Sequence, residues 1–223
     1  MRINKYIAER SDLSRRAADE AIIQNRVLVN GKLPTAGQQV QNSDVVKLDN
    51  CILSDKPKTI TIMLNKPAGF VCSRDGQGSK TIYELLPPEF LALNPIGRLD
   101  KDTSGLILLT NDGDLHNKLA HPKYDKQKTY VIALHKKLSD ADLHKIVNIG
   151  IDIGDDRLSS FSVKKVYNKK HLSAYEVILS EGRNRQIRRT FKELGYFVNH
   201  LHRTQFDNYK LGNLEVGKIS IIS

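Results

Sequence analysis

The sequence predicts an α+β protein with a small N-terminal domain, followed by a larger domain built on a mixed, largely antiparallel sheet. Two observations lead to this prediction. Short β-rich runs bounded by turn residues outnumber helical patterns after residue 59, and they do not alternate with helices as in a doubly wound fold. A polar stretch with Pro57 separates the first segment from the rest. We therefore expect domains at residues 1–47 and 59–223, joined by a linker over residues 48–58.

The first segment reads as two short helices and a small hairpin sheet. Ile3, Tyr6 and Ile7 share one helical face, and Ser14 can cap a second helix. Residues 27–29 are strand-like, the Asn30-Gly31 pair is typical of a two-residue hairpin turn, and residues 44–48 form the closing strand.

The larger domain is expected to hold many short strands and few helices. The predicted strands cover residues 60–64, 106–110, 129–134, 160–166, 174–179, 197–201 and 219–222. The predicted helices cover residues 81–86, a short segment around Leu115 and Leu119, residues 139–147, and residues 184–194, where Gly195 ends the last one.

Composition indicates a folded, basic protein. Of the 223 residues, 39% are hydrophobic and 27% charged, which allows a core and argues against global disorder. Lys and Arg outnumber Asp and Glu by 35 to 25, for a net charge of +10. This excess favours a polyanionic partner, most often nucleic acid or an anionic membrane surface.

Several classes of protein are disfavoured. Cys51 and Cys72 lie far apart, so neither a disulfide framework nor a zinc site is indicated. His200 and His202 have no third candidate ligand nearby, and we interpret them as structural or RNA-facing; no metal site is predicted. Without a secretory signal or a long apolar run, we expect a cytoplasmic protein with no membrane partner.

Two segments have the composition of a catalytic or binding site. Residues 97–105 form a glycine-bounded turn that carries Arg98 and Asp100 ahead of an apolar strand. Residues 183–189 hold four arginines. Arg188 follows the buried seam residue Ile187, so it borders the core and should need a carboxylate partner. The alternative is a plain phosphate-binding stripe.

The first segment resembles the S4 RNA-binding domain. The pattern runs from Arg2-Ile-Asn-Lys-Tyr-Ile-Ala through Ser14-Arg-Arg-Ala-Ala to Arg26-Val-Leu-Val-Asn-Gly-Lys. This resemblance implies that Lys5, Arg15 and Arg16 contact RNA phosphates, a role that suits clustered cations.

Three further motifs resemble those of the ribosomal-RNA pseudouridine synthases of the RsuA type. They are Gly97-Arg-Leu-Asp-Lys-Asp-Thr-Ser-Gly, Lys128-Thr-Tyr-Val and Glu181-Gly-Arg-Asn-Arg-Gln-Ile-Arg-Arg. Residues 63–69 also match the strand and loop that precede the first motif. The resemblance implies a pseudouridine synthase domain, an isomerase that converts a specific uridine of ribosomal RNA and needs no cofactor.

The same resemblance implies roles for individual residues. Asp100 would be the catalytic aspartate, Tyr130 would pack on the target base, and Arg188 would pair with Asp100. Arg98 would reach toward the RNA helix that the flipped base leaves. The other cations of these motifs would bind RNA: Lys128, Arg183, Arg185 and Arg189. A carboxylate can act as a covalent nucleophile or deprotonate a sugar intermediate, and the residues leave this choice open. A flipped base needs an aromatic surface such as Tyr130.

Two other functions compete with this interpretation. Asp100-Lys-Asp-Thr103 satisfies the Asp-x-Asp-x-Thr pattern of haloacid-dehalogenase-like phosphatases, but the hydrophobic strand follows the motif instead of preceding it. A non-catalytic ribosome-assembly factor would have the same charge and the same first domain. The loop at residues 73–78 and the compact length favour small-subunit over large-subunit RNA as substrate. We expect a monomer that acts on ribosomal RNA, free or within an assembling subunit.

Overall fold

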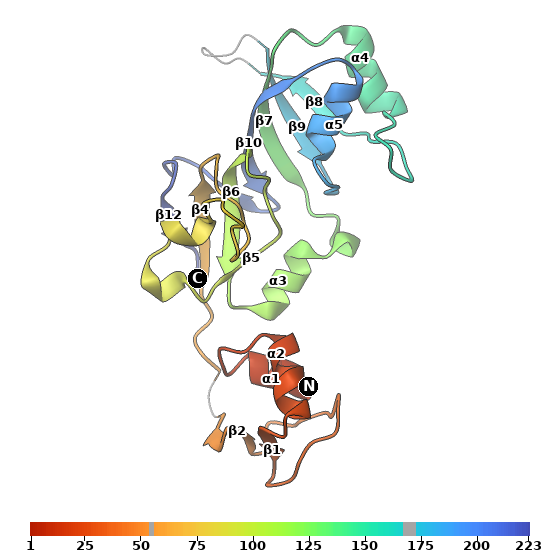
Figure 1. Cartoon of the computed structure of the whole chain (residues 1–223). Helices are drawn as coiled ribbons and strands as arrows, with labels where there is room; N and C mark the ends of the chain where they lie inside the picture. The colour runs from red at the N-terminus through yellow and green to blue at the C-terminus, as the bar shows by residue number, and fades with distance from the viewer. Residues whose placement is uncertain (54–55, 167–172) are drawn as a thin grey trace. The chain divides into compact units, whose positions relative to one another are not determined.

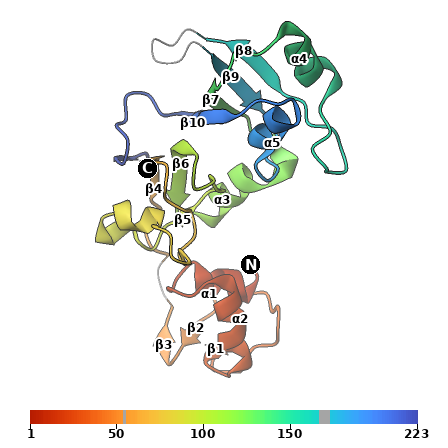
Figure 2. The ribbon, with the colours of Figure 1, turned by 45° about the horizontal axis from the view of Figure 1, so that its top comes forward.

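The computed structural model describes residues 1–53, 56–166 and 173–223. The chain forms two compact units, Met1–Thr59 and Ile60–Ser223. Figure 1 shows the elements of both units, and Figure 2 shows them from a second direction.

The first unit packs two helices on a three-stranded antiparallel sheet. Helices α1 (Ile3–Ala8) and α2 (Arg15–Ile23) bury the predicted apolar face of Ile3, Tyr6 and Ile7. The strands follow in the order β1 (Val27–Val29), β2 (Val46–Leu48) and β3 (Cys51–Ile52). The hairpin turn is confirmed, because Asn30 and Gly31 have φ angles of 51° and 78°, as a type I′ turn requires.

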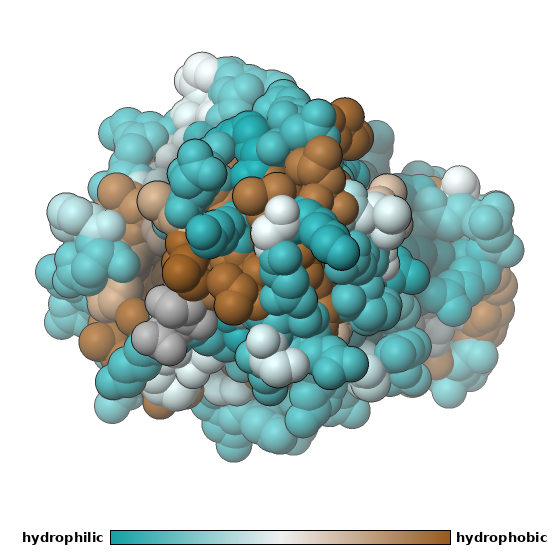
Figure 3. All heavy atoms as spheres, turned by 90° about the horizontal axis from the view of Figure 1, so that it is seen from below, coloured by the Kyte–Doolittle hydropathy of each residue, from teal (hydrophilic) through white to brown (hydrophobic). Residues whose placement is uncertain are grey.

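The sheet of this unit extends into the residues predicted as linker. Leu48 pairs with Val27, and Cys51 pairs with Leu48, so β3 adds a third strand. Two linker residues, 54 and 55, lie outside the described residues. The surface of the unit is not uniformly polar, and Figure 3 shows hydrophobic side chains among hydrophilic ones. Its exposed large hydrophobic residues include Ile23, Leu33, Val45 and Ile52.

The second unit is built on one mixed sheet in the order β12-β4-β6-β10-β7-β9-β8, with β5 beside β6 and β11 beside β10. The strand bounds are β4 Thr61–Lys66, β5 Asn94–Pro95, β6 Ser104–Thr110, β7 Lys128–Leu134, β8 Ser162–Lys165, β9 Ala174–Leu179, β10 Val198–Phe206, β11 Tyr209–Lys210 and β12 Ile219–Ile221.

The strand pairs of this sheet are antiparallel, except that β6 and β10 run parallel. The predicted α+β class with a largely antiparallel sheet is therefore confirmed. This arrangement also argues against a haloacid-dehalogenase-like phosphatase. Strand β6 follows the Asp-x-Asp-x-Thr pattern instead of preceding it, and the described strands form no parallel, doubly wound sheet.

The sheet is buried on both faces at β4 and β6. Ile62, Leu64 and Ile107 belong to one core cluster. Met63 and Leu106, which alternate with them, belong to a second cluster on the opposite face. Burial of both faces explains why these strands read as continuous apolar runs instead of alternating ones.

The helices of this unit are short. They are α3 (Gly113–Ala120), α4 (Asp140–His144) and α5 (Gln186–Glu193), with helical turns η1 (Ile82–Leu85), η2 (Pro88–Phe90), η3 (Pro122–Tyr124) and η4 (Lys145–Ile149). The predicted cap Ser139 accepts a hydrogen bond from the Asp142 amide, but the α-helix lasts only five residues before it widens into a π-turn. Helix α5 packs against β10, and α3 against β6 (Figures 1 and 2). None of the described helices has the length and apolar character needed to cross a bilayer.

Candidate active site

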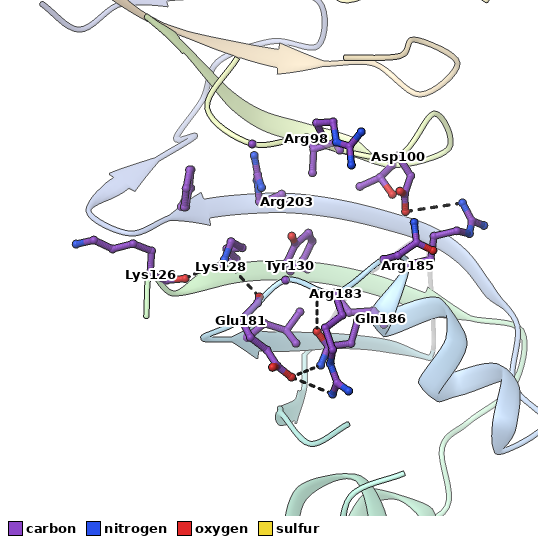
Figure 4. Close-up of a pocket in the computed structure, with 18 of the residues that line it drawn as sticks. Arg98, Asp100, Lys126, Lys128, Tyr130, Glu181, Arg183, Arg185, Gln186 and Arg203 are labelled. Carbon is purple, nitrogen blue, oxygen red and sulfur yellow. Dashed lines mark hydrogen bonds and ion pairs between the residues drawn. The ribbon is translucent and has the colours of Figure 1, made fainter. Parts of the chain in front are cut away.

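A cavity of about 710 Å³ opens in the second unit between the loop before β6 and the strands β7 and β10 (Figure 4). Most site residues predicted for this unit line it: Arg98, Asp100, Lys128, Tyr130, Arg183, Arg185 and Arg188. Arg189 does not line it, and Lys5, Arg15 and Arg16 belong to the first unit.

The loop that carries Asp100 is anchored from beneath by Lys66. The Lys66 ammonium is fully buried at the end of β4 and donates to the carbonyl oxygens of Thr103 at 2.7 Å, Pro67 at 3.0 Å and Lys101 at 3.4 Å. Burial lowers the pKa of Lys66, because the ammonium has lost its water. One side chain therefore holds the part of the turn that follows Asp100.

A second anchor fixes the residue directly before Asp100. The Cys72 Sγ donates to the Leu99 carbonyl and accepts from the Leu99 amide, both at 3.3 Å. Burial raises the pKa of the Cys72 thiol, so it remains the neutral donor that this pairing requires. With Leu99 buried and the Lys66 contacts on the other side, Asp100 has little freedom, although its side chain is 33% exposed to the cavity.

Tyr130 projects from the middle of β7 on the same face as the cavity. Its side chain is part of the main core cluster and also lines the cavity. The two interpretations of a strand tyrosine, core packing or a surface for a base, therefore both apply. Its cross-strand neighbour on β10 is Arg203.

Arg185, not Arg188, forms the ion pair with Asp100. The Arg185 Nη1 lies 3.7 Å from the Asp100 Oδ2 and 3.9 Å from the Asp102 Oδ2. Arg185 is the cap residue of α5 and has a left-handed backbone with φ of 46°. This conformation turns its side chain toward the Asp100 loop (Figure 4).

The predicted Arg188–Asp100 pair is thus corrected. The Arg188 guanidinium donates to the Val198 carbonyl at 2.8 Å and to the Asp102 carbonyl at 3.0 Å. It needed polar partners, as expected for a residue at the edge of the core, but backbone oxygens supply them. Burial lowers the pKa of Arg188, and Arg185 lowers it further. Arg188 therefore ties α5 to the start of β10 and to the loop that carries Asp100.

Carboxylates of the same unit hold Arg183 and Arg189, both of which are partly buried. Arg183 contacts Asp155 at 3.3 Å and Glu181 at 3.0 Å, and Arg189 contacts Asp155 at 2.8 Å. Arg189 also donates to the Ile153 carbonyl. The two arginines lower the pKa of Asp155, mainly through the Arg189 hydrogen bond. These contacts give both side chains partners within the protein, and their contact with RNA phosphate stays a prediction.

The cations predicted to contact RNA in the first unit lie at its helices. Arg15 and Arg16 are exposed at the start of α2, where Ser14 accepts a hydrogen bond from the Ala17 amide. Lys5 lies on α1, with its ammonium 3.6 Å from Glu9. The two arginines therefore remain accessible at a helix end.

Sequence reasoning missed Lys66, Cys72 and Arg203. Lys66 stood in a quoted motif, but nothing local showed that its ammonium would be buried. Arg203 carries a visible signal, because it falls on the buried side of β10 two residues after Leu201. Among the described residues, no three His, Cys, Asp or Glu side chains come together as a metal site would require.

A fixed carboxylate in a cavity rich in cations is the arrangement expected of an enzyme that acts on a polyanion. The comparisons agree with this class. The family model for RNA pseudouridylate synthases matches residues 60–193, and that of the S4 domain matches residues 1–46. The chain belongs to the RNA pseudouridylate synthase family and is an RNA pseudouridine synthase.

Individual relatives support the same assignment over the whole chain. The dual-specificity RNA pseudouridine synthase RluF of Escherichia coli K12 is 36% identical over 98% of this chain and 74% of its own length. Ribosomal large subunit pseudouridine synthase B of Bacillus subtilis is 36% identical over 97% of this chain and 89% of its own. A crystal structure of a pseudouridylate synthase matches with a TM-score of 0.70 and 31% identity, covering 100% of this chain and 96% of that one. The resemblance drawn from the motifs is confirmed.

Proposed function

We propose that this enzyme converts a specific uridine of ribosomal RNA to pseudouridine, with Asp100 as the catalytic carboxylate. The observation that carries the proposal is the fixed Asp100, held by Lys66 and Cys72 at a cavity that Tyr130 and Arg185 also line. Membership of the family supports the reaction, and the names of the relatives support ribosomal RNA as the substrate.

The reaction is an isomerisation within one nucleotide. The bond between the sugar C1′ and the base N1 breaks, and a bond between C1′ and C5 forms. The base loses a proton from C5 and gains one at N1, so no oxidant, reductant or group donor is consumed. We therefore propose that the reaction needs no cofactor.

Asp100 can serve this reaction in two ways. It can attack C1′ and hold the sugar as an ester while the base turns, or it can remove a sugar proton and let the base depart and return. In both routes the Arg185 guanidinium, 3.7 Å from the Asp100 Oδ2, faces the carboxylate that acts on the sugar. Tyr130 offers an aromatic surface for a uridine that has left its stack.

The names of the relatives favour large-subunit RNA. Two of them, from Bacillus subtilis and Pasteurella multocida, are named ribosomal large subunit pseudouridine synthase B. The composition of the loop at residues 73–78 and the length of the chain favour the small subunit, but they are weaker signals than these relatives. We therefore propose a uridine of the large subunit as the target.

Pseudouridine mapping tests this proposal. Ribosomal RNA from cells with and without the protein is labelled with carbodiimide and read by primer extension. We expect one stop in large-subunit RNA to disappear with the protein and to return with the wild-type chain. An unchanged map would overturn the proposal and favour the non-catalytic assembly factor, whereas a lost stop in small-subunit RNA would overturn only the choice of subunit.

A further inference from the structure

Among the described residues, Arg203 is a buried cation without a carboxylate partner. Its side chain projects from β10 into the cavity wall, and the residue is only 2% exposed. The guanidinium Nε donates to the Leu106 carbonyl at 2.7 Å. Its Nη2 is buried and finds no hydrogen-bond partner within the described part of the chain. Burial of a guanidinium with an unpaired N–H group costs free energy unless an acceptor completes its hydrogen bonds.

The other arginines around the cavity differ from Arg203. Arg183 and Arg185 each lie within 4 Å of a carboxylate, and Arg188 donates to two carbonyl oxygens. Arg203 has one backbone acceptor and, among the described residues, no ion pair. On the α5 side of the cavity, Arg183 and Arg185 thus have carboxylate partners, whereas the described residues provide none for Arg203 on the β10 side.

Lys128 adds a second cation at the same place. Among the described residues, its ammonium bonds only to carbonyl oxygens, those of Lys126 at 3.2 Å and Glu181 at 3.3 Å. Both cations stand over one aromatic ring, because the Lys128 Nζ lies 5.7 Å and the Arg203 Cζ 4.9 Å from the centroid of Phe206. Burial lowers the pKa of Lys128, and the neighbouring charge of Arg203 lowers it further. The two like charges repel, and an anion between them would relieve that repulsion.

The position of this pair relates it to the candidate active site. Arg203 and Tyr130 are directly paired across β10 and β7, so their side chains stand side by side on the cavity face (Figure 4). Arg98, on the loop that leads to Asp100, faces the same region and is exposed. A nucleotide with its base at Tyr130 would thus have cations within reach of its backbone.

We propose that Arg203 and Lys128 form an anion site on the cavity wall beside Tyr130, and that this site holds a backbone phosphate of the RNA at or next to the target uridine. That this phosphate belongs to RNA rests on the function proposed above. A neutral carbonyl of the base would satisfy one N–H group but would leave the two charges facing each other, so a phosphate is the better ligand.

The first experiment tests the anion site without RNA. Unfolding temperatures of the full chain are measured in sodium phosphate and in sodium chloride of equal ionic strength. We expect phosphate to raise the unfolding temperature of the wild type, because an anion that binds only the folded state stabilises it. Arg203→Met should lose this rise, and Lys128→Met should lose most of it. The second variant guards against a folding defect in the first, since the Lys128 ammonium bonds to the carbonyl oxygens of Lys126 and Glu181, whereas Arg203 bonds to a carbonyl of β6.

Arg74→Met is the matched control. Arg74 lies outside the cavity, bonds to the carbonyl oxygens of Leu91, Ala92 and Leu93, and is an arginine of the same unit. Its variant should keep the full phosphate response. An equal response in Arg203→Met and wild type, or no response in the wild type, would overturn the site.

The second experiment tests whether the phosphate that binds here belongs to RNA. Binding of a ribosomal RNA transcript that contains the mapped uridine is measured over a range of salt concentrations. Loss of one phosphate contact should reduce the slope of log K against log salt by about 0.7–0.9 in Arg203→Met, and leave it unchanged in Arg74→Met. An unchanged slope in Arg203→Met, together with a lost phosphate response, would assign the site to a free anion and overturn the RNA contact. If mapping finds no target uridine, the first experiment still decides the anion site.

Discussion

Asp100 owes its position to two side chains that sequence patterns gave no reason to select. The buried Lys66 ammonium donates hydrogen bonds to three carbonyl oxygens, two of them in the turn. The Cys72 thiol bonds to both the amide and the carbonyl of Leu99. A carboxylate fixed in this way meets its substrate at one angle, and this fixed position is what a reaction with tight geometric demands requires.

Asp100→Asn should abolish conversion and leave RNA binding intact. The amide keeps the shape of the side chain but is neither a nucleophile nor a base, so we expect activity to fall by about 1,000-fold or more. Single-turnover pseudouridine formation and RNA binding are measured on the same preparation. Asp102→Asn is the control, because the Asp102 carboxylate is 65% exposed and does not line the cavity, and it should remain active. Measurable turnover by Asp100→Asn would refute the catalytic assignment.

For single residues, the motifs predicted correctly which side chains line the cavity, but they predicted one of the ion pairs wrongly. Asp100 and Tyr130 line the cavity as expected, but Arg185 takes the ion pair that was assigned to Arg188. Helical spacing could not foresee this exchange, because Arg185 lies outside the regular helix in a left-handed conformation. Arg203 was missed because its partner Tyr130 is 73 positions away along the chain (203 − 130).

At the scale of elements, the parallel pair of β6 and β10 depends on Gly105. This glycine has φ of 106°, and a Cβ at this position would lie 2.2 Å from the Arg203 carbonyl oxygen and 2.5 Å from its amide nitrogen. Both atoms are backbone, so neither can move aside without breaking the strand pair. The glycine that closes the catalytic motif thus allows β10 to carry Arg203 against the cavity.

Gly105→Ala should therefore destabilise the second unit strongly. Backbone strain and the clash together predict a loss of about 2 kcal/mol or more in the free energy of unfolding. Gly113→Ala is the control, because Gly113 begins α3 with nothing within 4 Å of the added Cβ. That variant should be neutral or more stable by up to about 1 kcal/mol. Chemical denaturation measures both, and equal stability of the two variants would contradict the account.

The segment before β8 is tied to the arginine-rich motif by one carboxylate. Asp155 forms ion pairs with both Arg183 and Arg189, which lie on either side of Arg185 in the sequence. We expect Asp155→Ala to lower kcat/KM by up to about 100-fold, because the backbone that aims Arg185 at Asp100 would lose its support. Asp156→Ala, which removes the neighbouring exposed carboxylate, should keep wild-type activity. Steady-state kinetics would argue against this role if both variants behaved alike.

Local patterns located the elements of the second unit more reliably than their pairing. Strand β9 has the predicted bounds, and β7 begins one residue early, since period and composition mark such segments well. The helix predicted at residues 139–147 is only half α-helical, and β10 runs five residues past its predicted end. The parallel neighbour of β6 could not be predicted, because contacts between distant segments leave no local pattern.

For the whole molecule, RNA binding should depend more on where the exposed positive charges lie than on the total net charge. Replacing Arg15 and Arg16 by Ala removes two exposed cations at the start of α2, and should weaken RNA binding and lower the salt slope by up to about 2. Arg26→Ala is the control in the same unit, because Arg26 is already paired with Asp49 at 2.5 Å. Binding titrations over a range of salt decide the outcome. A slope shared by wild type and the double variant would exclude the phosphate contacts assigned to α2.

Composition and short, ordered patterns along the chain were enough to predict the fold class, the basic character, the family and the residues of its motifs. The folded chain was needed to show which arginine faces Asp100, which arginines pair with Asp155 and Glu181, and that the buried Arg203 has no carboxylate partner among the described residues. The physical reason is that charge pairing depends on the distance between side chains from remote parts of the chain. A motif states which groups are present, and packing sets which of them meet.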